Sequence, residues 1–211
     1  GAVAGSAVTL DAWTGEVLAI SNYPVFNPNA RSMLDYGGAR NRAVTDVYEP
    51  GSTIKTLTLV AALESGRFSL DSLIDTSPGR IRVGSKVLHD PRNYGEMTVS
   101  NVIEKSSQVG VTKLAQAVGH EAILDVLHRF GLGEDTGTGF PGERAGVLPE
   151  LAHWSDIEKV TLAFGYGLNA TPIQLARAYA VFANAGVLRP LTLLKLDRKS
   201  TRLNSSHQII S

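Results

Sequence analysis

The feature that most constrains this chain is a nearly all-apolar helical segment that begins directly after a helix-breaking Pro-Gly pair. Pro50 and Gly51 end the preceding segment, and residues 53–65 then form a predicted helix that Gly66 terminates. Most side chains after Lys55 in this segment are apolar, and a helix that is apolar on nearly every side is buried in a protein core. The sequence therefore predicts a central buried helix against which the rest of the chain packs.

Two side chains at the start of this helix have the chemistry for acyl transfer. Ser52 lies in the predicted first turn and Lys55 follows three residues later, so both side chains lie on one face of the helix. A serine hydroxyl is a weak nucleophile until a base removes its proton, and a neutral lysine amine can act as that base. Burial can lower the pKa of a lysine amine from about 10.4 far enough for this role. The first backbone N–H groups of the helix can stabilise an oxyanion.

The same tetrapeptide also has an ordinary structural interpretation. A Ser-x-x-Lys sequence arises by chance about once in a chain of this length. Ser52 would then cap the helix, and Lys55 would be a solvated surface residue. The apolar residues that follow favour the catalytic interpretation, because they place the lysine at the edge of a core.

The composition is that of one globular domain or a large part of one. The chain has 211 residues, of which 43% are hydrophobic and 19% are charged. Its 20 basic and 20 acidic residues balance without a basic stripe, so nucleic-acid binding has no electrostatic support. The lack of cysteine excludes disulfides and thiolate chemistry. The sequence contains neither a signal peptide nor an apolar run of about 18 residues, and it begins in strand-like sequence, so we expect it to be part of a longer protein.

The remaining sequence predicts a helical body with an N-terminal β-hairpin. Residues 7–10 and 16–20 form the hairpin strands around a turn that ends in Gly15, and residues 21–45 form a long irregular connection. A second, small hairpin has Gly84 and Ser85 at its turn. Further helices are predicted at 99–105, 109–118, 120–130 and 155–164, and from a capping box at 171–174 to just before Gly186.

The triplet Ser106-Ser107-Gln108 lies between two predicted helices, where the chain changes direction and side chains can face a cleft. Alone it fits ordinary polar residues at a helix junction, and its weight comes from its pairing with Ser52 and Lys55. Two glycine-rich segments, 137–142 and 165–170, lack the preceding parallel strand of a phosphate-binding or dinucleotide-binding loop. The histidines have no ligand spacing, so we expect no metal and no cofactor.

Several segments together resemble the class B penicillin-binding proteins of cell division, which are peptidoglycan D,D-transpeptidases. A Ser-x-x-Lys tetrapeptide and a second serine-containing triplet are known marks of penicillin-binding proteins. The resemblance runs from about residue 5 to residue 195, and it is carried by segments 14–19, 40–46, 49–55, 92–95, 139–143 and 164–168.

The resemblance implies an α+β fold in which a helical subdomain packs against a five-stranded antiparallel sheet, with the active site between them. It implies that Ser52 is the acylated nucleophile, that Lys55 is its general base, and that Ser106 relays a proton toward the leaving D-alanine nitrogen. The family usually has Asn at the third position of the triplet, where it hydrogen-bonds the substrate amide. Here Gln108, which is longer by one methylene, stands at this substrate-binding position.

Two features depart from the family. A Lys-Thr-Gly motif, which the family has on a sheet strand well beyond the last predicted helix, is absent. We therefore expect residues 1–197 to be a partial transpeptidase domain that retains only the N-terminal hairpin of the sheet, and we expect this truncated chain to be inactive or nearly so. Residues 198–211 resemble no part of the family, and we interpret them as a non-family tail of artefactual origin.

The leading hypothesis is a peptidoglycan D,D-transpeptidase that cross-links stem peptides in septal cell-wall synthesis through a serine acyl-enzyme. The resemblance implies peptidoglycan stem peptides as substrates, β-lactams as acylating inhibitors and membrane proteins of the division machinery as partners. It also implies a location at the periplasmic face of the inner membrane through an N-terminal anchor. Two alternatives stay open: a serine β-lactamase or carboxypeptidase, which shares Ser52 and Lys55, and a non-catalytic β-lactam sensor or inert fragment.

Overall fold

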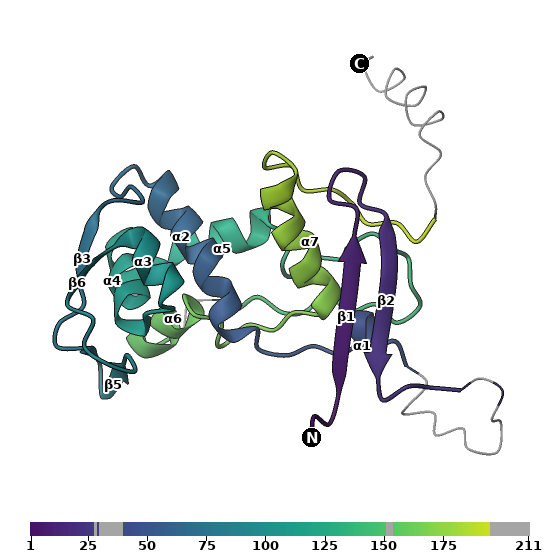
Figure 1. Cartoon of the computed structure of the whole chain (residues 1–211), viewed down its shortest axis with the longest axis horizontal. Coiled ribbons are helices and arrows are strands. Elements are labelled where there is room, and N and C mark those ends of the chain that lie inside the picture. The colour runs from purple at the N-terminus through teal and green to yellow at the C-terminus, as the bar shows by residue number, and fades with distance from the viewer. Residues whose placement is uncertain (28, 30–39, 151–153, 195–211) are drawn as a thin grey trace, which may run out of the picture. The chain divides into compact units, whose positions relative to one another are not determined.

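The computed structural model describes residues 1–27, 29, 40–150 and 154–194, and the chain divides into two compact units (Figure 1). The first unit contains residues 1–46, 134–145 and the chain from residue 171 onward, and the second contains residues 47–133 and 146–170. Each unit therefore combines segments that are far apart in the sequence. Both units mix helices with antiparallel strand pairs, which confirms the α+β prediction.

The first unit is a β-hairpin with helices against it. Strands β1 (Gly5–Leu10) and β2 (Val17–Tyr23) pair antiparallel, and the turn between them has Gly15 at a φ of 79°. Helix α7 (Pro172–Ala183) lies beside β1, and the short helix α1 (Arg42–Thr45) contacts both (Figure 1). A small apolar core joins these elements; it contains Val44, Ile173 and Leu191, with Val8, Leu10, Val17, Ile20 and Phe140 packed against them.

The predicted N-terminal hairpin is confirmed, but the predicted irregular connection over residues 21–45 is wrong at both of its ends. Strand β2 continues to Tyr23, and α1 closes the segment, while residue 28 and residues 30–39 lie outside the described residues.

The Asn22 side chain holds α1 in place. Its oxygen accepts the Ala43 N–H at 2.9 Å, and its amide group donates to the Asn41 side chain at 2.8 Å. These partners are distant in sequence, so local propensity does not reveal them.

The predicted capping box at the start of α7 is confirmed. The Gln174 N–H donates to the Thr171 hydroxyl at 3.2 Å, and the Thr171 N–H donates to the Gln174 side-chain oxygen at 2.9 Å. Gln174 is fully buried, and its side-chain amide also donates to the carbonyl oxygens of Glu134, at 2.8 Å, and Ala145, at 2.6 Å. One side chain therefore starts the helix and fastens both ends of the loop between these two residues.

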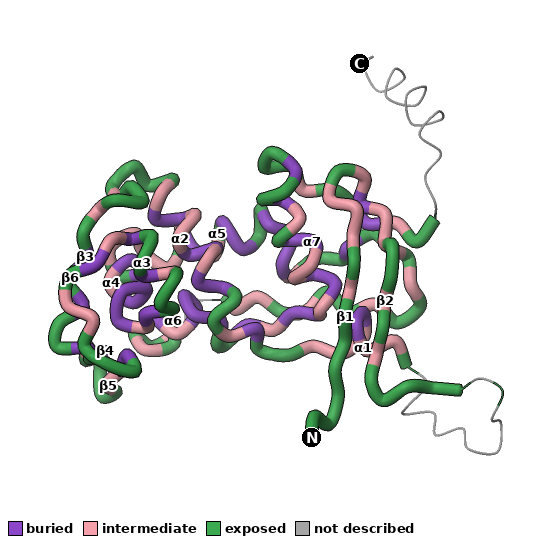
Figure 2. Tube along the Cα trace, viewed as in Figure 1, coloured by how far each residue is buried: buried purple, intermediate pink, exposed green. Residues whose placement is uncertain are grey.

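The second unit is built around α2 (Lys55–Glu64), which the apolar run predicts. A 3₁₀ turn, η2 (Gly51–Ile54), leads into it, and α4 (Gln108–Val118) and α5 (His120–Arg129) pack against it. Figure 2 shows buried stretches along both α2 and α4. Two further helices also contact α4, and each begins at a predicted cap; they are α3 (Val99–Glu104), after Thr98, and α6 (Asp156–Leu162), after Ser155.

Two strand pairs complete the described part of the second unit. Strands β4 (Arg80–Val83) and β5 (Lys86–His89) form the predicted small hairpin. Strands β3 (Leu73–Asp75) and β6 (Glu96–Thr98) also pair antiparallel, and the sequence does not predict this pair, because each strand is only three residues long and the hairpin separates them. Among the described residues, no helix has the length and apolar character needed to cross a membrane.

Replacing Gln174 by Met keeps the approximate side-chain length but leaves the Thr171 N–H and two carbonyl groups without their partner. A buried polar group that loses its hydrogen bond costs about 1–3 kcal/mol, and the Thr171 N–H is such a group, so we expect the free energy of unfolding to fall by about 1–3 kcal/mol. Urea denaturation measures this change. Gln116→Met, the same substitution at an exposed position of α4, should change it by less than about 0.5 kcal/mol, and equal losses for the two variants would contradict the assignment.

Candidate active site

The start of the central helix places Ser52 and Lys55 on one face. Residues 51–54 form a 3₁₀ turn, in which side chains three positions apart are eclipsed, so Ser52 and Lys55 project from the same side. The Lys55 N–H donates to the Ser52 carbonyl oxygen across this turn. Ser52 is exposed, whereas Lys55 is only 6% exposed. The turn therefore places an exposed serine and a buried lysine three residues apart on one side of the chain.

The Lys55 amine contacts a second predicted site residue, Ser106. Its Nζ donates to the Ser106 carbonyl oxygen at 2.6 Å and lies 3.0 Å from the Ser106 Oγ. The two residues are 51 positions apart, and the contact depends on the packing of α2 against α3 and α4. Ser106 is exposed, as Ser52 is. The structure therefore brings the lysine and the first serine of the triplet together.

The surroundings of Lys55 favour its neutral form. Burial lowers the pKa of the Lys55 amine, and the negative charge of Asp90 opposes this shift without cancelling it. A neutral amine has two N–H donors and one lone pair. If Ser106 takes both donors, through its carbonyl oxygen and its hydroxyl, the lone pair stays available to accept a proton. The burial that the sequence predicts for this lysine thus acts in the direction that a general base requires.

The backbone at Ser106 has an uncommon conformation. Its φ is 52°, in the left-handed region that residues other than glycine rarely adopt. Such a residue costs about 1–3 kcal/mol and persists only where its surroundings fix it. It lies in the short turn between α3 and α4, where the sequence predicts a change of chain direction. Two contacts from the Lys55 amine hold Ser106 itself. The next two residues, Ser107 and Gln108, are held by hydrogen bonds to the Asp90 carboxylate.

Asp90 is the residue of this region that the sequence did not reveal. Asp90 is only 8% exposed, and its carboxylate accepts three hydrogen bonds at the start of α4: from the Ser107 hydroxyl at 2.6 Å, from the Gln108 N–H at 2.5 Å and from the Val109 N–H at 3.1 Å. It therefore holds the first turn of α4 and, with it, the turn at Ser106. The only signal in the sequence is an acidic residue before a proline, which is common in loops and does not indicate a partner 17 positions away.

Gln108 is placed by its backbone, because the contact with Asp90 uses its N–H group. It is the first residue of α4, and it is partly exposed. The expected contact between its side chain and the substrate amide stays a prediction.

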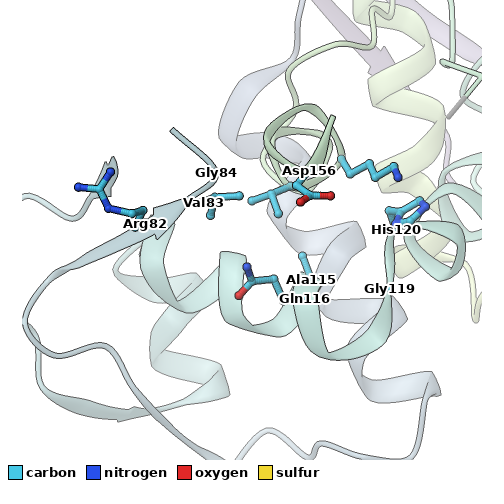
Figure 3. A pocket seen from close by; sticks show the side chains of 10 residues that line it. Arg82, Val83, Gly84, Ala115, Gln116, Gly119, His120 and Asp156 are labelled. Atoms are coloured by element: carbon cyan, nitrogen blue, oxygen red, sulfur yellow. The ribbon is translucent and has the colours of Figure 1, made fainter. Parts of the chain in front are cut away.

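A pocket of about 330 Å³ lies elsewhere in the second unit, and none of the predicted site residues lines it. It is formed by the β4–β5 hairpin, the end of α4 and the starts of α5 and α6 (Figure 3). Figure 3 shows His120 and Asp156 on its wall. In the described ranges, no group of three His, Asp or Glu side chains is placed to hold a metal ion.

The sequence model of the penicillin-binding protein transpeptidase domain matches residues 5–210. The chain belongs to the penicillin-binding transpeptidase family. Peptidoglycan D,D-transpeptidase FtsI of Escherichia coli K12 is 46% identical over 196 residues, which cover 93% of this chain and 33% of that protein. The probable peptidoglycan D,D-transpeptidase PbpC of Pseudomonas aeruginosa is 41% identical over 195 residues, which cover 92% and 34%. This transpeptidase chain thus spans about a third of the length of these curated relatives.

Solved structures of transpeptidase-family proteins have the same fold. A peptidoglycan glycosyltransferase from Burkholderia ambifaria superposes with a TM-score of 0.83 at 38% identity, covering 93% of this chain and 58% of that one. The transpeptidase domain of Burkholderia pseudomallei penicillin-binding protein 3 gives 0.82 at 38% identity, covering 94% and 55%. These likenesses confirm the α+β transpeptidase fold. The predicted boundary between residues 197 and 198 falls within 195–211, outside the described residues, and stays a prediction.

Replacing Asp90 by Asn should change both the stability and the pH dependence of this site. An amide has one acceptor oxygen where the carboxylate uses two, so we expect the free energy of unfolding to fall by about 1–3 kcal/mol. Because the Asp90 charge raises the pKa of Lys55, its loss should lower that pKa further. If Lys55 is the general base, the rate of acylation by penicillin rises as Lys55 loses its proton, and the acid limb of the pH–rate profile should then move to lower pH.

The control for this variant is Asp125→Asn, which removes an exposed carboxylate that pairs with Arg129 at 2.7 Å. An exposed ion pair contributes about 0–1 kcal/mol, and Asp90, not Asp125, is the charge that acts on the pKa of Lys55, so neither the acid limb nor the free energy of unfolding should change much. An acid limb that stays in place in Asp90→Asn would show that Asp90 does not act on the Lys55 amine.

Proposed function

We propose that this chain carries the acyl-transfer site of a septal peptidoglycan D,D-transpeptidase, with Ser52 as nucleophile and Lys55 as general base. The observation that supports this most directly is the buried Lys55 amine, one turn from the exposed Ser52 and hydrogen-bonded to Ser106. The similarity to proteins named peptidoglycan D,D-transpeptidase gives the substrate class.

In the acylation step, the Ser52 hydroxyl oxygen attacks the carbonyl carbon of the D-alanyl-D-alanine peptide bond, and neutral Lys55 takes the hydroxyl proton. The oxyanion of the tetrahedral intermediate lies against N–H groups at the start of the helix, which have no partner within it. The intermediate collapses, the C–N bond breaks, and the proton passes from Lys55 through the Ser106 Oγ to the leaving D-alanine nitrogen. The 3.0 Å separation of Nζ and Oγ suits this relay.

In the second step, the amine of a neighbouring stem peptide attacks the ester carbonyl of the acyl-enzyme. Lys55 takes a proton from the attacking nitrogen, and the Ser52 oxygen leaves with a proton, so that the serine is regenerated and a new peptide bond cross-links the two strands. A β-lactam follows the first step only, because its leaving nitrogen stays attached to the acyl group. Acylation by penicillin therefore reports on this half of the site.

The proposal for the full-length protein includes its surroundings. Peptidoglycan stem peptides are its substrates, membrane proteins of the division machinery are its partners, and it acts at the periplasmic face of the inner membrane. The similarity to FtsI supports these assignments, which concern the longer protein and extend beyond the site in this chain.

A fluorescent penicillin tests the proposal. We expect covalent labelling that Ser52→Ala abolishes and that Lys55→Ala slows by at least about 100-fold, since general-base catalysis contributes about 100- to 10,000-fold. In the family, the residue just past the Lys-Thr-Gly motif supplies a second oxyanion donor, and this motif is absent from the sequence. Because loss of one such donor costs about 100- to 1,000-fold, labelling of the 211-residue chain should be slower than that of the full-length protein. Ser100→Ala, which changes an exposed serine on α3, is the control and should leave labelling unchanged.

The fate of the label separates the alternatives. A stable adduct supports a transpeptidase or a sensor, and turnover of a stem-peptide substrate by the full-length protein then identifies the transpeptidase. Rapid release of the label would indicate a hydrolase, and a full-length protein that is never labelled at Ser52 would refute the proposed function.

Gln108→Asn in the full-length enzyme should leave acylation by penicillin equal or faster. The substitution restores the usual side chain of the family at this position, and it keeps the backbone contact with Asp90. Gln116→Asn on the same helix is the control. A clear loss of acylation rate in Gln108→Asn alone would show that the longer side chain is properly fitted to this site.

A further inference from the structure

We propose that the segment 163–167 positions the N–H group of Ser52 for acyl transfer, with Gly165 as the central positioning residue. The proposal rests on the proposed role of Ser52 as nucleophile. It gives a function to a glycine-rich segment whose sequence resembles a phosphate-binding loop only superficially.

The segment is bonded directly to the residues that precede the nucleophile. The Gly51 N–H donates to the Gly165 carbonyl oxygen at 3.2 Å. The Gly167 N–H donates to the Glu49 carboxylate at 2.9 Å. Glu49 and Gly51, which flank Pro50 just before Ser52, are therefore both bonded to one short segment. This segment lies more than a hundred positions later in the chain.

Bonds on both sides extend this attachment. In α2, the buried Thr58 hydroxyl donates to the Ala163 carbonyl oxygen at 2.8 Å. On the other side, Tyr48 and Ala170 form an antiparallel bridge, with N–H···O distances of 3.1 and 3.0 Å. The segment 163–167 is thus bonded at three points to residues from Glu49 to Thr58, on both sides of Ser52 and Lys55, and the Tyr48–Ala170 bridge adds a fourth attachment just beyond the segment.

Gly165 makes the closest approach in this attachment. It is buried and has a φ of 87°, which L side chains rarely adopt. A Cβ on this residue would lie 2.5 Å from the Gly51 nitrogen and 2.7 Å from its carbonyl carbon, and closer still to its carbonyl oxygen. All three are backbone atoms, so no side-chain rotation can make room. Any substitution at Gly165 must therefore change the position of the Gly51 peptide group relative to residue 165.

Movement of the Gly51 peptide group would change the direction of the Ser52 N–H group, because both belong to one rigid unit. The Gly51 carbonyl and the Ser52 N–H belong to the same planar peptide, so a rotation that moves the oxygen turns the N–H by the same angle. Ser52 lies at the start of a helical turn, where N–H groups lack partners within the helix and can stabilise an oxyanion. Gly165 therefore sets the direction of a catalytic donor without touching the substrate.

Gly66 provides a matched control at the other end of α2. Its φ of 68° is also in the left-handed region, but a Cβ there would have no atom within 4 Å. Gly66→Ala thus has the same kind of backbone strain as Gly165→Ala without the contact. A difference between the two variants reports on the contact with the Gly51 peptide alone.

Two measurements on the full-length protein test the proposal. Amide hydrogen exchange should be faster over residues 49–55 in Gly165→Ala than in Gly66→Ala, and this readout needs no catalysis. The acylation rate constant at saturating penicillin should fall by about 10- to 100-fold, up to the loss of one oxyanion donor, while the half-saturating concentration stays within about 3-fold. A purely structural role would not separate these two kinetic constants.

The outcomes distinguish this proposal from the proposed function. Exchange over residues 49–55 that matches Gly66→Ala overturns the positioning role, and so does faster exchange with an unchanged acylation rate constant. A wild-type protein that is not acylated refutes the function of Ser52 and, with it, the catalytic meaning of the contact, while the exchange data still decide whether the contact exists.

If Gly165→Ala does not fold, Glu49→Ala is compared with Glu64→Ala, at the far end of α2, in the same two measurements. Faster exchange over residues 49–55 and a lower acylation rate constant in Glu49→Ala than in Glu64→Ala, both smaller in size than expected for Gly165→Ala, support the proposal. Equal values for these two variants overturn it.

Discussion

The site depends on one desolvated amine. Lys55 has little contact with water, yet its Nζ is bonded to both the carbonyl oxygen and the hydroxyl of Ser106. Burial lowers the pKa of this amine and Asp90 raises it, so its protonation state follows from two opposing effects of the surrounding fold. A lysine in water would stay protonated at neutral pH and could accept nothing. In the proposed mechanism, the reactivity of the exposed Ser52 therefore depends on a residue that has little contact with water.

Asp90 links this electrostatic balance to the backbone. The same carboxylate that acts on the Lys55 amine holds the first turn of α4 through Ser107, Gln108 and Val109. This first turn of α4 also fixes Ser106 in its left-handed conformation, which costs about 1–3 kcal/mol. A strained serine, a buried acid and a buried amine thus support one another, and removing any one of them changes the environment of the other two.

The parts of this structure that the sequence predicts are those governed by near neighbours in the chain. The apolar run predicts α2, capping residues predict the starts of α3, α6 and α7, and the spacing of three places Ser52 and Lys55 on one face. The parts that it does not predict depend on distant partners. Asp90, the pairing of β3 with β6 and the fixing of α1 by Asn22 have no local signature, and the glycine-rich segment at 165 looks like an imperfect loop motif until its contact with Gly51 is known. The family resemblance supplied the role of Ser106, which spacing alone does not give.

The buried amine also makes the stability of the fold depend on pH. Between the lowered pKa of Lys55 and its ordinary value, the unfolded chain holds a proton that the folded chain does not, so stability rises with pH across this window. Below the window the folded state holds a poorly solvated charge, and the burial of Lys55 reduces stability at neutral and acidic pH. Apolar burial elsewhere in the fold must offset this cost. Leu57, Ala61 and Ala62, buried on the turns that follow Lys55, supply apolar contact for this purpose at no further polar cost. The apolar character that makes α2 recognisable in the sequence is thus part of the burial that lowers the pKa of the lysine at its first position.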